Sequence, residues 1–271
     1  MTKDVFIAIP SYGGKPIYQC IRSADYAVLK KDNPAKEVQL YVGDSLVTRC
    51  RNELVRLFLN TDCKYLLFID DDLEFDPRHI ERLRSHNQPI VGGLYFKKNL
   101  LHAPVLNRPG QSYDNGLMEV GEVGTGFLMI RRDVFGAMKE WYDIEYAGAG
   151  DQEQGKRWDF FPVGRKDADP RAQYLSEDYF FCQRATELGY KVFVDQNVVI
   201  NHIGIASYPP KQEHLAQGLS ESLKIMNVAE KLPEAVVDDL LGKLSEYKGR
   251  HYNINDKIEV LKPLKEVSPK G

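Results

Sequence analysis

The chain has 271 residues, of which 43% are hydrophobic and 28% charged, and this composition is typical of a soluble globular protein. The length fits one sizeable domain, or one domain with an appended lobe, and the composition argues against a disordered, collagenous or membrane chain. A formal net charge of −3 excludes a general attraction to nucleic acids or anionic membranes.

The first part of the chain alternates between apolar runs and segments with helical periodicity. Continuous β-branched and aromatic runs are typical of strands that are buried on both faces. On these patterns we expect strands over 5–9, 38–42, 65–69 and 90–95, and helices over 16–29, 45–60 and 77–85. The alternation predicts an α/β fold, with a mostly parallel central sheet flanked by helices.

The second part of the chain is less regular. A glycine-containing turn leads into an expected strand over 127–130, and two short strands are expected over 192–194 and 198–200. A helix is expected over 176–188, with Ser176 as its N-cap. From about residue 211 the pattern is helical again. We therefore expect a catalytic domain over 1–210 and a helical extension over 211–271.

The segment 146–173 is long, polar and without periodicity, which indicates a lid or a disordered segment. It also contains three aromatic residues, Trp158, Phe160 and Phe161. These rings either meet a sugar, on which aromatic side chains stack well, or attach the segment to the core.

Four cysteines, Cys20, Cys50, Cys63 and Cys182, are scattered without a C-x-x-C pair. This spacing argues against a structural zinc site and against a disulfide framework. We expect reduced thiols and a cytoplasmic setting. No signal-peptide pattern precedes the first strand, and no apolar stretch is long enough for a transmembrane segment.

Three aspartates, Asp70, Asp71 and Asp72, follow the apolar run 65–69 directly. Three adjacent negative charges are costly unless a cation lies nearby, and a divalent metal would also accept phosphate oxygens. Because side chains alternate at a strand end, we expect Asp70 and Asp72 to face one cavity and Asp71 to turn aside. The alternative is a solvated acidic loop that caps the next helix. Ligands gather at the carboxyl ends of strands in α/β sheets, which favours the metal site.

The aspartates belong to an ordered series of short motifs. The series comprises Ile9-Pro10-Ser11-Tyr12, the run LLFIDDD ending at Asp72, the run GTGFLMIRR starting at Gly124, Ser176-Glu177-Asp178 and Asn201-His202. In this order the motifs resemble the GT-A-fold glycosyltransferases, especially the family-2-like group, over roughly residues 5–205. The matching features are the nucleotide-binding turn, the D-x-D motif, the acceptor-side glycine turn, the E-D segment and a late metal-site histidine.

The resemblance implies a Rossmann-like GT-A sheet that binds a nucleoside-diphosphate sugar, UDP- or GDP-linked, together with a divalent metal. It places Asp70 near the ribose and the metal, and it makes Asp72 and His202 metal ligands. Carboxylate and imidazole together suit Mn²⁺ or Mg²⁺. The alternative for His202 is an exposed histidine in a turn.

Nucleotide contacts are expected from the first strand end, the start of the second helix and the aspartates. The expected residues are Pro10, Ser11, Tyr12, Asp44, Arg49, Arg51, Asp70 and Asp71. Tyr12 either stacks on the base or is a buried core tyrosine. Arg49 and Arg51 suit phosphate or a base edge, although arginines on exposed helix faces are usually only solvated.

Asp178 and Glu177 open the helix expected over 176–188. If the reaction inverts the anomeric centre, a carboxylate must take the proton of the acceptor hydroxyl. Asp178 is the candidate for that base, and Glu177 is its supporting partner or substitute. The alternative is that both residues only stabilise the helix dipole.

These residues predict a metal-dependent glycosyltransferase that moves a sugar to a hydroxyl-bearing acceptor, which is a glycan, a protein, a small molecule or a modified nucleic acid. One alternative is a metal-dependent phosphohydrolase acting on nucleotide sugars. Another is a non-catalytic glycan-binding module on a transferase fold, which would need neither metal nor nucleotide. A sugar nucleotidyltransferase is disfavoured because no G-x-G-T-R-like loop follows the first strand.

Overall fold

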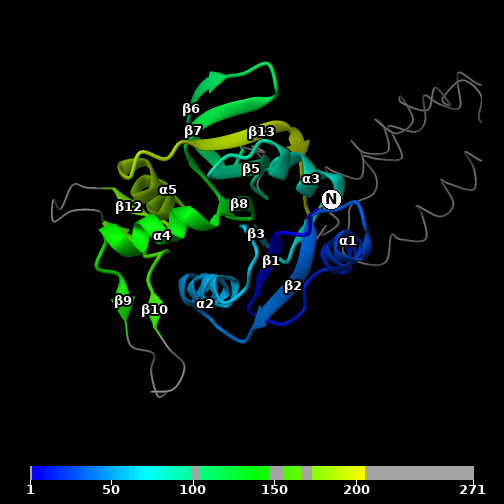
Figure 1. The fold of residues 1–271 in the computed structure, drawn as a ribbon, viewed down its shortest axis with the longest axis horizontal. Helices are drawn as coiled ribbons and strands as arrows, with labels where there is room; N and C mark the ends of the chain where they lie inside the picture. Colours follow the sequence, from blue (N-terminus) through cyan, green and yellow to red (C-terminus); the bar gives the residue numbers. More distant parts are fainter. Residues whose placement is uncertain (1, 99–103, 147–155, 166–172, 205–271) are drawn as a thin grey trace, which may run out of the picture. The chain divides into compact units, whose positions relative to one another are not determined.

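The computed structural model describes residues 2–98, 104–146, 156–165 and 173–204. Within this part of the chain, an eight-stranded sheet carries helices on both faces (Figure 1). The expected helical extension over 211–271 lies outside the described residues, and so does the expected domain boundary at 210.

The central sheet has the strand order β2-β1-β3-β8-β5-β13-β7-β6. Its strands are β1 Val5–Ser11, β2 Ala35–Val42, β3 Tyr65–Ile69, β5 Ile90–Leu94, β6 Leu106–Ser112, β7 Leu117–Val123, β8 Phe127–Arg131 and β13 Val192–Val199. All of them run in one direction except β7 and β8, which run in the opposite one. The expected α/β class and the mostly parallel sheet are therefore confirmed.

The helices form two layers, one on each face of the sheet. They are α1 Tyr18–Leu29, α2 Val47–Leu59, α3 Arg78–Ser85, α4 Arg132–Trp141 and α5 Glu177–Glu187. Apolar residues of α2, α4 and α5 share one core with one face of the sheet, and those of α1 and α3 share a second core with the other face. The alternation along β3 shows the division, because Leu66 and Phe68 belong to the first core whereas Leu67 and Ile69 belong to the second.

Short two-stranded pairs lie outside the central sheet. They are β4 Leu73–Glu74 with β14 Asn201–His202, β9 Glu145–Tyr146 with β10 Arg157–Trp158, and β11 Gly164–Arg165 with β12 Tyr174–Leu175. The first of these pairs joins the segment after the aspartates to the segment that carries His202, since His202 pairs with Leu73.

The expectation of two short strands over 192–194 and 198–200 is wrong, because β13 is one strand with a register shift between Asp195 and Val199. The residues at this register shift are polar, and from the sequence alone they suggest a loop between two strands. In the structure the fully buried Asp195 accepts hydrogen bonds from Arg82 of α3 and from the backbone N–H of Asn197. These bonds satisfy the buried carboxylate and keep the strand continuous.

The hairpin β6–β7 and helix α4 were not expected from the sequence. Strand β6 contains Pro109 and Gly110, which are poor strand formers, and its residues are almost all exposed. It lies at the edge of the sheet, where pairing with β7 provides the order that its own sequence does not indicate.

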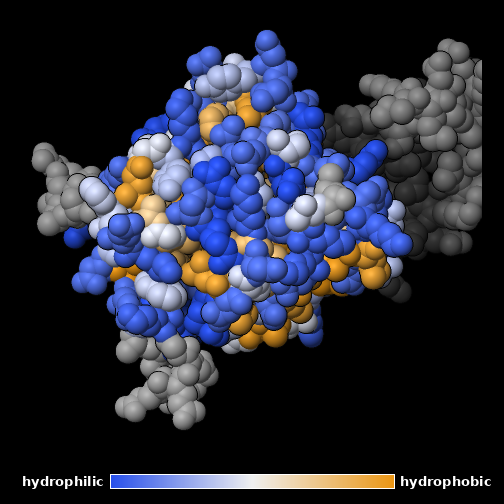
Figure 2. All heavy atoms as spheres, in the orientation of Figure 1, coloured by the Kyte–Doolittle hydropathy of each residue, from blue (hydrophilic) through white to orange (hydrophobic). Residues whose placement is uncertain are grey.

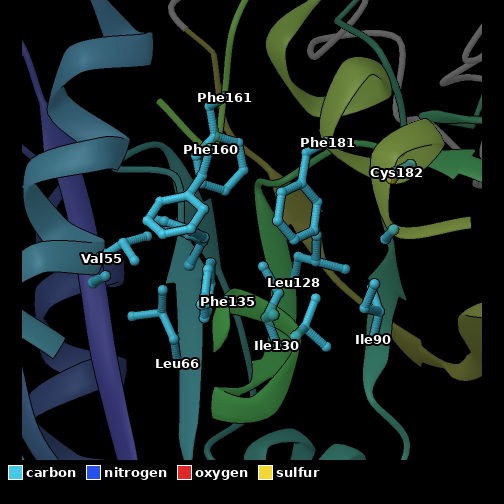
Figure 3. Close-up of a cluster of buried hydrophobic side chains, with 14 of the residues drawn as sticks. Val55, Leu66, Ile90, Leu128, Ile130, Phe135, Phe160, Phe161, Phe181 and Cys182 are labelled. Carbon is cyan, nitrogen blue, oxygen red and sulfur yellow. The ribbon is translucent and has the colours of Figure 1, made fainter. Parts of the chain in front are cut away.

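The aromatic residues of the segment 146–173 attach it to the core. Phe160 and Phe161 are fully buried, and the ring of Phe161 stacks on Phe181 at 4.7 Å between centroids (Figure 3). Both backbone N–H groups donate to Asn52 Oδ1, at 3.0 and 3.2 Å. For these two rings the interpretation as core anchors holds, whereas residues 147–155 and 166–172 lie outside the described part.

The face seen in Figure 2 is mostly hydrophilic, and its apolar side chains form separate small patches. All four cysteines are free and buried, in agreement with the expected absence of disulfides. In the described residues, no helix combines the length and the apolar character needed to cross a membrane.

Candidate functional site

A polar cavity lies at the carboxyl ends of β1 and β3, beside the start of α2. Its volume is about 230 Å³. It is lined by Pro10, Ser11, Tyr12, Asp44, Ser45, Val47, Cys50, Arg51, Asp70, Asp71 and Asp72. The structure thus brings together every residue expected to contact the nucleotide except Arg49, which is not among the lining residues.

Each aspartate of the cluster has a different partner. Asp70 Oδ1 accepts from Arg51 Nη2 at 3.0 Å, Asp71 Oδ2 accepts from Ser11 Oγ at 2.5 Å, and Asp72 Oδ2 pairs with the ammonium of Lys98. All three aspartates line the cavity. The expectation that Asp71 turns aside is therefore wrong, because the chain turns directly after β3 and no longer alternates as a strand does.

The cluster makes its surroundings strongly negative. Burial raises the pKa of Asp71, and the charges of Asp72 and Asp70 raise it further, against the hydrogen bond from Ser11. Burial, followed by the charges of the same three aspartates, raises the pKa of the Cys20 thiol to about 12, so the thiol stays protonated. A cation at this position would relieve the repulsion.

Asp72 and His202 form the part of the site that fits a divalent metal. His202 Nδ1 lies 2.6 Å from the backbone oxygen of Phe96, which can only accept, so Nδ1 carries the proton and Nε2 presents its lone pair in the neutral ring. Nε2 lies 3.4 Å from Asp72 Oδ1, a buried oxygen for which the described part of the chain supplies no hydrogen-bond partner. A metal-ligating histidine is commonly oriented in this way, by a hydrogen bond from its other ring nitrogen to a backbone carbonyl or a carboxylate.

The distance between Asp72 Oδ1 and His202 Nε2 agrees with the coordination of one metal ion by both atoms. Two ligand atoms that each lie about 2.1 Å from one ion are roughly 3.0–3.4 Å apart at octahedral or tetrahedral angles. Across the described residues, no group of three or more His, Cys, Asp or Glu side chains is arranged to hold a metal. A two-residue site leaves the other positions to water and substrate phosphates, as Mg²⁺ sites in proteins often do.

Arg51 connects the aspartates to the start of α5. Its side chain is only 4% exposed, and its Nε lies 3.4 Å from Glu177 Oε1 while its Nη2 binds Asp70. The guanidinium also lies over the ring of Phe68, at 5.3 Å from the centroid. Its Nη1 is buried and without a partner among the described residues. The alternative of a merely solvated helix arginine is therefore wrong for Arg51, and its expected nucleotide contact stays a prediction.

Asp178 lies half-buried at the start of α5, directly after Glu177. It accepts hydrogen bonds from the hydroxyl of Ser176 and from the backbone N–H of Tyr179. Burial raises the pKa of Asp178, and the charge of Glu177 raises it further. Ser176 is the N-cap residue as expected, but its hydroxyl serves the carboxylate and makes no capping bond.

Tyr12 and Arg49 lie on the solvent side of the cavity. Tyr12 is 71% exposed, so the alternative of a buried core tyrosine is wrong. Arg49 binds Asp44 through Nε and Nη2, at 2.6 and 2.8 Å, and this pairing lowers the pKa of Asp44. Arg49 is thus engaged with Asp44, and its expected nucleotide contact stays a prediction.

The glycine turn before β8 packs against the aspartates. Gly126 accepts from the backbone N–H of Asp70 at 2.8 Å, and its own N–H donates to the hydroxyl of buried Tyr95 at 3.0 Å. A Cβ at this position would lie 2.7 Å from Tyr95 Oη and 2.9 Å from Asp70 Oδ2. The turn needs glycine because both side chains occupy the space of a Cβ.

Gly126→Ala is therefore expected to lower the free energy of unfolding by about 1–3 kcal/mol, because Tyr95 or Asp70 must move. Chemical denaturation measures this change. Gly136→Ala is the matched control, since Gly136 is exposed in α4 with no atom within 4 Å of an added Cβ. That substitution should stabilise the fold by about 0.5–1 kcal/mol. Equal effects of the two substitutions would contradict the steric role of Gly126.

Sequence reasoning did not find Lys98 or Tyr95 as site residues. Both follow β5, and the rule that ligands gather at the carboxyl ends of strands points to this position. The ion pair of Arg51 with Glu177 was also missed, because the two residues are far apart in the chain and carry no joint signal.

No protein-family model and no curated protein matches the chain. Solved structures with a similar arrangement include A197 from STIV, at 18% identity and a TM-score of 0.48, over 76% of this chain and 87% of that one. GalNAc-T7 with UDP, GalNAc and Mn²⁺ is 9% identical, with a TM-score of 0.46, over 75% of this chain and 44% of that one. A glycosyltransferase involved in glycosylation of the major capsid of PBCV-1 is 11% identical, with a TM-score of 0.31, over 50% and 63%. At these identities the likenesses concern chain arrangement alone and assign no activity to this chain.

Proposed function

We propose that the chain is a metal-dependent glycosyltransferase, which moves a sugar from a nucleoside-diphosphate sugar to a hydroxyl group of an acceptor. The observation that carries the proposal is the pair formed by Asp72 Oδ1 and His202 Nε2. These two atoms lie 3.4 Å apart, and Asp72 lines the polar cavity at the strand ends. The motif series that resembles GT-A-fold glycosyltransferases assigns the same two residues to the metal.

On the donor side, Asp72 and His202 would hold the metal, and Asp70 is a further candidate through its second carboxylate oxygen. When bound, the metal would neutralise the charge that grows on the departing diphosphate. Tyr12 offers an exposed ring on which a base can stack, and Ser11 holds Asp71 in the cavity wall. Arg51 lines the same wall and keeps Asp70 in place.

On the acceptor side, Asp178 is the candidate base. Its raised pKa makes the carboxylate a better proton acceptor than an ordinary exposed aspartate. Glu177, held by Arg51, positions the start of α5 relative to the aspartates. In a reaction that inverts the anomeric centre, Asp178 would take the proton of the attacking hydroxyl while the diphosphate leaves on the opposite side.

A thermal-shift screen of UDP-, GDP-, CMP- and dTDP-sugars, with and without Mn²⁺, tests the proposal. A donor at 100 times its Kd should stabilise the fold by about 2.7 kcal/mol, which raises Tm by roughly 5–10 °C for a chain of this size. We expect this shift only when donor and metal are both present. Asp72→Ala should remove the shift while leaving the far-UV circular dichroism unchanged.

Asp25→Ala is the control, because Asp25 is exposed in α1 and lies outside the cavity lining. It should keep the full metal-dependent shift. A metal-dependent shift of native size in Asp72→Ala would contradict the metal assignment. Release of sugar phosphate or free sugar at the same rate with and without an added hydroxyl acceptor would instead favour hydrolysis of the nucleotide sugar.

A further inference from the structure

Lys98 is a cation of the site that the motif series does not include. Its ammonium donates to Asp72 Oδ2, and its side chain is 35% exposed. Its stem packs against Gly204, where an added Cβ would lie 3.0 Å from Lys98 Cδ. The same short segment supplies the Phe96 carbonyl that orients His202. The segment after β5 therefore binds one oxygen of Asp72 through Lys98 and orients, through Phe96, the histidine that faces the other oxygen.

The two oxygens of Asp72 have separate tasks in this arrangement. Oδ1 faces His202 Nε2 and is free for a metal, whereas Oδ2 is taken by Lys98. An ammonium has three N–H donors, and Asp72 accepts one of them. The other two would remain for the oxygens of a ligand held beside Asp72.

A nucleoside diphosphate matches this combination of charges. Its two phosphates carry more negative charge than one divalent ion neutralises, so a second cation beside the metal stabilises it further. Arg51, a cation that lines the cavity, already shares its charge between Asp70 and Glu177. Within residues 2–98 and the other described ranges, Lys98 binds a single carboxylate oxygen and keeps donors for a phosphate.

We propose that Lys98 is a diphosphate-binding residue of this site, which contacts the phosphates directly and stabilises the nucleoside diphosphate as it leaves. The inference rests on the proposed glycosyltransferase function and adds to it a residue for leaving-group binding. It predicts that Lys98 distinguishes diphosphates from monophosphates, because the second phosphate adds the negative charge that a second cation would neutralise.

Calorimetric titration of the full-length protein with UDP, GDP, UMP and GMP, in the presence of Mg²⁺, tests the inference. Lys98→Ala should weaken diphosphate binding about 10- to 100-fold, the range for a lost hydrogen bond to a charged group, and should affect the monophosphates much less. Lys98→Arg, which keeps the positive charge, should retain most of the affinity. Lys97→Ala is the matched control, because Lys97 is the exposed neighbouring lysine.

Mn²⁺ binding, followed by electron paramagnetic resonance, separates direct contact from an indirect effect. Lys98→Ala should bind Mn²⁺ at least as tightly as the wild type, because a competing cation leaves Asp72. Parallel losses of Mn²⁺ and diphosphate binding would overturn the inference, since Lys98 would then act only by placing Asp72.

The outcomes also separate this inference from the proposed function. Equal diphosphate affinity in Lys98→Ala and the wild type would overturn the role of Lys98 alone. No binding of any tested diphosphate to the wild type would overturn the proposed function, and the role of Lys98 with it.

Discussion

Replacement of Arg51 by methionine is expected to lower the free energy of unfolding by about 3 kcal/mol. This value is the lower end of the range for breaking a buried ion pair, chosen because Asp70 is about one-third exposed. Arg51 is almost fully buried and binds Asp70 and Glu177. Methionine would leave these two carboxylates without their counter-charge. Guanidinium denaturation followed by circular dichroism measures the change.

Arg49→Met is the matched control, two residues away on the same helix. Arg49 is 55% exposed, and its pair with Asp44 is expected to contribute much less to stability than the buried pairs of Arg51. Arg51→Lys should lie between the two, because lysine keeps the charge and loses the fork of donors. If Arg51→Met and Arg49→Met unfold at the same denaturant concentration, the result would contradict a stabilising bridge from Arg51 to Asp70 and Glu177.

Asp178→Asn is expected to reduce sugar transfer by about 10²- to 10⁴-fold, the usual contribution of a general base. Donor binding should stay unchanged, because Asp178 is not among the residues that line the donor cavity. Steady-state kinetics with a saturating acceptor, together with donor titration, separate the two effects. Unimpaired turnover of Asp178→Asn would remove Asp178 from the mechanism.

The pH dependence of kcat/KM provides a second readout for Asp178. A base must be deprotonated, so activity falls as the pH drops through its pKa. Burial and the charge of Glu177 raise this pKa, so the acid limb should lie at higher pH than an ordinary carboxyl would produce. Glu177→Gln removes one of the raising charges and keeps a hydrogen-bond acceptor, so the limb should move to lower pH. A limb that stays in place would show that another group titrates.

The sequence predicted the α/β class and the first half of the fold well. Strand β3 begins and ends at the expected residues, and α1, α2 and α3 each begin and end within two residues of the expected positions. These elements are buried on faces that their own apolar periodicity defines, so local pattern and tertiary burial agree. In the second half, β6 depends on its pairing with β7 at the sheet edge, and β13 depends on the hydrogen bonds of the buried Asp195. The local sequence pattern indicates neither of these contacts.

The polar face of α2 shows where periodicity misleads. Asn52 and Glu53 lie on the face opposite the apolar positions of the helix, yet both are buried. Asn52 binds the backbone of the segment that carries Phe160, and Glu53 binds Arg157. A polar residue can be buried wherever a distant segment supplies its partners, and a single sequence does not state which segment that is.

For the candidate site, the sequence by itself determined that acidic and polar residues stand at strand ends, since the apolar runs stop directly before them. The tertiary structure decided how those residues divide their tasks. The turn after β3 sends Asp70 to Arg51, Asp71 to Ser11 and Asp72 to Lys98 and His202. Side-chain direction after a strand end depends on the turn and on the charges that packing brings near. Those charges come from α2 and from the segments after β5 and β13, which only the folded chain places together.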